Sequence, residues 1–158
     1  MLVEPFLGLG KSVNRLRAER SAEQTVALVE SRQKSRGHLH AAGAYFTVVN
    51  VHNPTDQQIA LTKRLALVGV AEKAGPVSEA ASAMLGPDQA LAVDCPDLHQ
   101  LSGGTQDFLE GYLLIDNPTH LNVVATYSAA GENGLVTTLD VQRIAPTTAV
   151  AHPAGTAR

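Results

Sequence analysis

Residues 44–56 read AYFTVVNVHNPTD, and the fold assignment starts from this stretch. Apolar and polar side chains alternate from Tyr45 to His52, which is the period of a half-buried β-strand. The residues that follow, Asn53-Pro54-Thr55-Asp56, are types that favour turns. A similar combination returns at 113–119 (LLIDNPT), through convergent turn chemistry or an internal repeat. The sequence therefore predicts two strands that each end in a chain reversal.

Further strands are predicted outward from this stretch, at residues 58–70, 90–95, 108–116, 121–128 and 135–144. Glu132-Asn133-Gly134 is the strongest hairpin signal, because Asn and Gly tolerate the backbone angles of tight turns. Lys63-Arg64 interrupts one strand pattern and suggests a bulge or an edge position. Residues 77–85 fit either a short helix or an irregular strand, and 97–106 are expected to form a polar loop.

Six or seven short strands joined by turns predict a mainly β fold, an antiparallel immunoglobulin-like β-sandwich over residues 44–146. A jelly roll or a small barrel is the alternative. The sequence has the apolar side chains that such a core requires. The predicted core consists of Val49, Val51, Ile59, Leu61, Leu65, Leu67, Leu91, Val93, Leu113, Ile115, Val123, Tyr127, Leu139 and Val141.

Residues 1–43 are expected to form an N-terminal helical arm and linker, with a helix over 12–36. Ser21 and Gln24 have the spacing of a capping box, and Gly37 is a suitable stop. Such a helix has a thin apolar stripe and must dock on another surface to persist. The residues predicted to form this interface are Leu16, Ala22, Val26 and Val29. Residues 147–158 lack periodicity and are expected to be a disordered tail.

The 158-residue chain has a formal net charge of -3, unevenly placed. The first 40 residues carry a basic excess and the remainder is acidic. This distribution leaves open a nucleic-acid adaptor that binds through Lys11, Arg15, Arg17 and Arg20. No stretch is long and apolar enough to span a membrane, and the N-terminus is a poor secretory signal. With one cysteine, Cys95, the expected location is the cytoplasm.

Residues 94–99 (DCPDLH) form the only cluster of cysteine, histidine and carboxylates. With His52, the pair Cys95 and His99 leaves open a metal-binding protein or a metal-dependent enzyme. The favoured interpretation is a buried and inert Cys95 on the inward face of a strand. Gly10-Lys11-Ser12 fails as a phosphate-binding loop, because that loop requires glycine where Pro5 stands. We therefore expect no catalytic residues, no cofactor and no bound metal.

Three segments carry a resemblance to known proteins: 45–68 (YFTVVNVHNPTDQQIALTKRLALV), 85–98 (LGPDQALAVDCPDL) and 107–129 (DFLEGYLLIDNPTHLNVVATYSA). They resemble small bacterial β-sandwich proteins, and their order is similar to that of the sensory rhodopsin transducer family. This resemblance covers about residues 44–145. It implies a compact sandwich that assembles as an oligomer and binds partners without catalysis, and it assigns no functional residue.

The predicted function is a non-enzymatic assembly or binding module. The sandwich is expected to form a homo-oligomer, with its N-terminal arm docked on a neighbouring subunit or on a protein partner.

Overall fold

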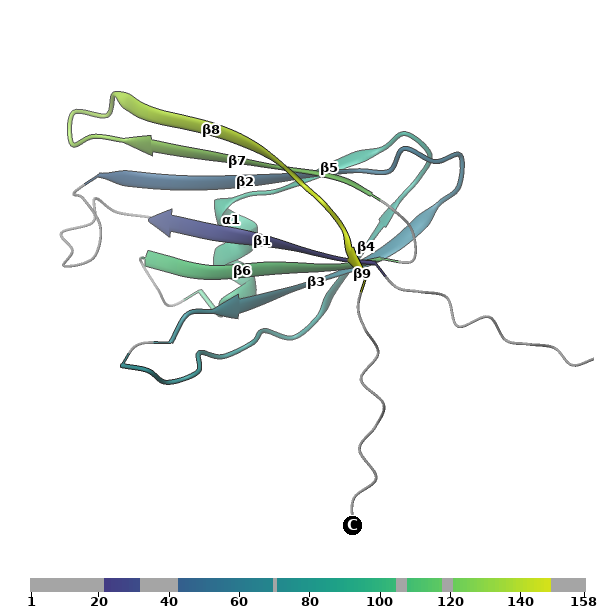
Figure 1. Cartoon of the computed structure of the whole chain (residues 1–158), viewed down its shortest axis with the longest axis horizontal. Coiled ribbons are helices and arrows are strands. Elements are labelled where there is room, and N and C mark those ends of the chain that lie inside the picture. Colours follow the sequence, from purple (N-terminus) through teal and green to yellow (C-terminus); the bar gives the residue numbers. More distant parts are fainter. Residues whose placement is uncertain (1–21, 32–42, 70, 105–107, 118–120, 149–158) are drawn as a thin grey trace, which may run out of the picture.

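The structure is a computed structural model, and it describes residues 22–31, 43–69, 71–104, 108–117 and 121–148. Two antiparallel sheets pack face to face (Figure 1). Sheet A has the order β4 (Ala81–Leu85), β3 (Ile59–Leu67), β6 (Phe108–Asn117), β1 (Ala22–Ser31) and β9 (Thr147–Thr148). Sheet B has the order β5 (Ala90–Val93), β2 (Ala44–His52), β7 (Asn122–Ala130) and β8 (Val136–Ile144). The mainly β sandwich is confirmed.

The strand order differs from that of an immunoglobulin constant domain, in which the first two strands are neighbours in one sheet. Here β1 pairs with β6 in sheet A, whereas β2 lies in sheet B. The chain closes one side of the sandwich where β8 leaves sheet B and continues as β9, which pairs with the start of β1.

The core lies between the sheets and contains most of the predicted residues. Nine of them are buried: Val49, Val51, Ile59, Leu61, Leu65, Val93, Leu113, Ile115 and Val123. Leu67, Leu91 and Tyr127 are partly buried against this cluster. Leu139 and Val141 were predicted wrongly, since they are 67% and 59% exposed. Both belong to β8, the outermost strand of sheet B, which pairs with β7 alone among the strands of this sheet.

The N-terminal helix is wrong for the residues the structure describes there. Ala22–Ser31 is β1, which pairs along its whole length with β6. Gln24, Val26 and Leu28 are buried, and Thr25 and Ala27 between them are exposed, as the period of two requires. Burial against β6 and β2 overrides the helical spacing of Ala22, Val26 and Val29. The rest of the predicted helix lies outside the described residues.

The first asparagine of each Asn-Pro-Thr segment lies where a strand of one sheet ends and the chain goes on to the other sheet. Asn53 follows β2 and leads the chain from sheet B to β3 in sheet A. Asn117 ends β6, after which the chain passes from sheet A to β7 in sheet B. Both asparagines are buried. The predicted reversal after β2 is therefore confirmed as a crossing between the two layers, and residues 118–120 of the second segment lie outside the described residues.

The helix α1 (Cys95–Leu101) replaces the loop expected after β5. Asp94 caps it by accepting from the backbone N–H of Asp97, whose side chain accepts from the N–H of Asp94 in return. Pro96 fits the first turn, where a missing N–H costs nothing. Leu98 inserts into the core and anchors the helix against β2 and β3. Cys95 therefore begins a helix and does not lie on the inward face of a strand.

Three further expectations concern the strands. Within residues 77–85, for which the sequence left a short helix or an irregular strand open, residues 81–85 form the strand β4. Lys63 and Arg64 lie in β3 between β4 and β6, so the expected edge is wrong. The Nη2 atom of Arg64 lies 2.9 Å from Oδ2 of Asp116 on β6, and this ion pair compensates the charge of Arg64 within the sheet. The hairpin over 132–134 is confirmed, with Gly134 at a positive φ of 78°.

Candidate functional site

The outer face of sheet B carries an exposed apolar surface. Strand register places Leu139 beside Ser128, and Ser128 beside Phe46. The next row consists of Val141, Thr126 and Val48. We call the exposed apolar side chains of these strands the β8 face; its members are Phe46, Val136, Leu139 and Val141, all at least 42% exposed. Contiguous apolar side chains of this kind mark an interaction surface more often than scattered ones do.

Strand β8 adds an open backbone edge to this surface. Of its nine residues, eight are exposed, and only Ile144 at its end is partly buried. Within the described residues, β7 is the only strand that pairs with β8. An open edge presents unpaired N–H and C=O groups to any chain that can add a strand. The β8 face and edge together are the candidate binding site.

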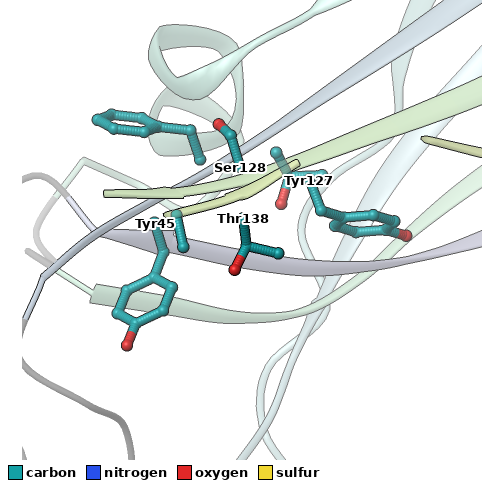
Figure 2. A pocket seen from close by; sticks show the side chains of 7 residues that line it. Tyr45, Tyr127, Ser128 and Thr138 are labelled. Atoms are coloured by element: carbon teal, nitrogen blue, oxygen red, sulfur yellow. The ribbon is translucent and has the colours of Figure 1, made fainter. Parts of the chain in front are cut away.

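A shallow groove of about 320 Å³ lies beside this site and is lined by residues of β2, β7 and β8, with Ala129 among them. Figure 2 shows Tyr45, Tyr127 and Thr138 on one side of the strands, with Ser128 directed to the opposite side. Thr47, Phe46 and Ala129 complete the lining, so the groove has rings and hydroxyls but no ionisable group other than phenols. Histidine and carboxylates are the side chains that most often act as general acids and bases near neutral pH, and this lining has neither.

Tyr127 makes one part of the groove sensitive to high pH. Burial, and after it the carboxylate of Asp140, raises the pKa of the Tyr127 phenol above its ordinary value. The unfolded chain then releases this proton at lower pH than the folded chain does. The contribution of Tyr127 to the free energy of unfolding is therefore complete below pH 10 and declines as the pH rises further.

We expect Tyr127→Phe to reduce the loss of stability at alkaline pH. Urea unfolding at pH 8, 10 and 11 should show a steeper decline for the unmodified protein than for Tyr127→Phe. Equal declines in the free energy of unfolding of the two proteins would show that the folded environment does not raise the pKa of Tyr127.

A second hollow of about 440 Å³ lies where α1 meets sheet A. Its charged lining consists of Lys63 from β3, Glu79 before β4 and Asp97 from α1. It contains no cysteine, histidine or serine, so its ionisable candidates for a nucleophile or a metal ligand are one lysine and two carboxylates.

The structure does not gather the predicted metal ligands. His52 ends β2, where its Nδ1 lies 3.4 Å from Nδ2 of Asn122 and its Nε2 lies 4.0 Å from Oδ1 of Asp88. Cys95 begins α1 and is half-buried, and His99 is buried on the same helix. Among the described parts of the chain, no three cysteine, histidine or carboxylate side chains are placed to hold a metal ion.

The predicted interface residues lie in different parts of the chain: some belong to β1, and one lies outside the described residues. Ala22 and Val26 are buried in β1 within the chain's own sandwich. Val29 belongs to the same strand. Leu16 lies outside the described residues, as do the basic residues Lys11, Arg15, Arg17 and Arg20.

Sequence reasoning missed the β8 face because the apolar residues of β8 were assigned to the core. The available signal was position: β8 follows a tight hairpin and is the last long strand, and such strands often lie at an edge.

Across the described residues, no helix has the length and apolarity needed to cross a membrane.

Comparisons with known proteins establish the fold alone. A scan against protein-family models gives no match. A search of the curated proteins gives none either. Among solved structures, the crystal structure of Thermotoga maritima 1070 is similar, with a TM-score of 0.52 at 12% sequence identity. The similarity covers 80% of this chain and 92% of that chain, so the two share most of their architecture.

Proposed function

We propose that this protein is a non-enzymatic assembly or binding module that forms a homo-oligomer through the β8 face. One observation carries the proposal: Leu139, Val141, Val136 and Phe46 are exposed together on one side of sheet B. Each large apolar side chain that is removed from water contributes about 1.5–3 kcal/mol, so a shared contact over this surface stabilises an oligomer.

The grooves support the non-enzymatic part of the proposal. The groove at Ala129 offers hydroxyls and rings, and the hollow at α1 offers one lysine with two carboxylates but no serine, cysteine or histidine. The resemblance to the sensory rhodopsin transducer family implies the same kind of assembling sandwich.

The proposal moves the interface away from the N-terminal arm. Val26 was predicted to contact a neighbour, but it is fully buried by its own chain. A contact through Val26 would require β1 to leave sheet A. The β8 face needs no such rearrangement, because its side chains are already exposed.

We expect Leu139→Lys to weaken the oligomer strongly. In a symmetric dimer the change removes two apolar contacts and adds two charges, so the dissociation constant should rise by about 100-fold or more. Light scattering across a concentration series gives the mass of each protein. Val77→Lys is the matched control, because Val77 is also 57% exposed but lies next to β3 in the other layer.

The control should keep the mass of the unmodified protein. A monomer at every concentration up to about 100 μM, with or without Leu139→Lys, contradicts the proposed self-association.

A further inference from the structure

The free edge of β8 is the longest exposed edge of sheet B. The opposite edge of that sheet is β5, with four residues, and β4 at the edge of sheet A has five. Short strands, prolines, charged side chains and bulges protect a sheet edge. β8 has nine residues without proline or lysine; its protections are the charges of Asp140 and Arg143 and a register shift against β7 at Ala129/Ala130. β1 also has an open side beyond Glu23, but its alternate side chains are buried in the core. Among the strands that the structure describes, only β8 combines an open edge with exposure on both faces.

A second copy of β8 can pair with this edge, and the side-chain charges distinguish the register centred on Asp140 from the one centred on Val141. A two-fold axis perpendicular to the sheet pairs residues of the two strands antiparallel, with both members of each pair on the same face. If the axis passes at Asp140, two carboxylates lie directly opposite each other, which is unfavourable. If it passes at Val141, Asp140 lies opposite the second copy's residue 142, which is a glutamine.

The polar pairing expected between the two copies already exists between neighbouring side chains of one chain. The amide Nε2 of Gln142 donates to Oδ2 of Asp140 at 2.9 Å. Across an axis at Val141 the same two groups meet again, so each carboxylate has two amide donors within reach. On the outer face, Val141 meets its own copy, and the aliphatic stem of Arg143 covers Leu139. The pair at Val141 is then apolar, the pairs of Asp140 with Gln142 are hydrogen-bonded, and Leu139 meets the apolar stem of Arg143.

We propose that β8 pairs antiparallel with β8 of a second copy about an axis at Val141, which joins two copies of sheet B into one eight-stranded sheet. The inference rests on the proposed self-association and specifies the partner, the edge and the register; of the β8 face it covers Val141 and Leu139 and leaves Phe46, two strands away on β2, exposed. An alternative occupant of the edge, such as a segment of the same chain or an extended peptide from another protein, gives different results in the experiments below.

Cysteine cross-linking in a Cys95→Ser background tests the register. Opposite residues of an antiparallel pair have Cα atoms about 4.5–5.5 Å apart, which is within the range of a disulfide. Val141→Cys should therefore form a covalent dimer on mild oxidation. Asp140→Cys should not, and neither should Thr126→Cys, which lies on the same face as Val141 but on β7. A dimer from Asp140→Cys alone overturns the register.

Hydrogen exchange on the unmodified protein gives a second readout that does not depend on any variant. The amides of β8 should exchange at least tenfold more slowly at a concentration where the oligomer forms than at one where it is dissociated. The amides of β4, the edge of the other sheet, should not change. Protection of β8 at every concentration overturns the pairing, because a segment of the same chain then occupies the edge.

The two proposals fail in different ways. An oligomer by light scattering whose β8 amides exchange freely, and whose Val141→Cys variant does not cross-link, overturns the edge pairing and leaves self-association standing. A monomer at every concentration overturns both. Protection that appears only on addition of an extended peptide assigns the edge to another protein and overturns the pairing of two copies.

Discussion

Asn53→Ala should lower the free energy of unfolding by about 3–5 kcal/mol, which is among the largest effects of a single polar residue in this fold. The side chain of Asn53 is fully buried at the corner between β2 and β3. Its Nδ2 donates to the carbonyl oxygens of Gln57, Leu85 and Gly86 at 2.7–3.2 Å. Alanine leaves these carbonyls without that donor in a place that water reaches poorly.

The amide oxygen of Asn53 stabilises the turn that follows β2. Its Oδ1 accepts from the backbone N–H and the hydroxyl of Thr55 at 3.0 and 2.8 Å. One side chain therefore connects the end of β2, the entry to β3 and the end of β4. Urea unfolding followed by circular dichroism measures the loss. Asn50→Ala is the control, because Asn50 is exposed on the same strand, and its effect should stay within about 0.5 kcal/mol.

An Asn53→Ala protein with the stability of the control would show that water replaces these bonds and that the corner is held by other contacts. Asn53→Asp separates donor from acceptor. The carboxylate still accepts from Thr55 but cannot donate to three carbonyls, so this variant should be nearly as unstable as Asn53→Ala near neutral pH.

The corner at Asn53 could be predicted from the sequence because its information is local. An asparagine before proline and threonine forms its turn from side chains two residues apart, whatever the rest of the chain does. The hairpin over 132–134 has the same character. The α1 helix also had a local signal, since Asp94 and Asp97 have capping-box spacing, but the strand pattern before Cys95 concealed it.

Strand β1 could not be predicted in this way because its conformation depends on distant partners. The segment AEQTVALVES contains apolar residues at helical and at strand spacing, so periodicity alone does not decide. Register with β6, about 90 residues later in the chain, selects the strand. The same argument applies to β8: its alternation indicates a strand correctly, but only the sheet order shows that no second layer covers Leu139 and Val141.

Gln24 joins these two strands, β1 and β8, and its removal should also destabilise the fold strongly. It is fully buried in β1 of sheet A, and its Nε2 donates to the carbonyl oxygens of Leu121 at 3.2 Å and Ile144 at 3.0 Å. Leu121 precedes β7 and Ile144 ends β8, so one amide connects sheet A to two strands of sheet B. Gln24→Ala removes both bonds and leaves a cavity, which together should cost about 3–4 kcal/mol.

The location of this loss distinguishes Gln24 from an ordinary core residue. Because Ile144 carries one of the two bonds, the end of β8 should open before the rest of the sandwich unfolds. Hydrogen exchange should therefore rise first in residues 141–144 of Gln24→Ala, and the self-association of the protein should weaken with it. Thr25→Ala, an exposed change on the same strand, should leave both unchanged. Uniform acceleration over the whole chain would instead make Gln24 a general core contact, and β8 would be held in place by its pairing with β7 alone.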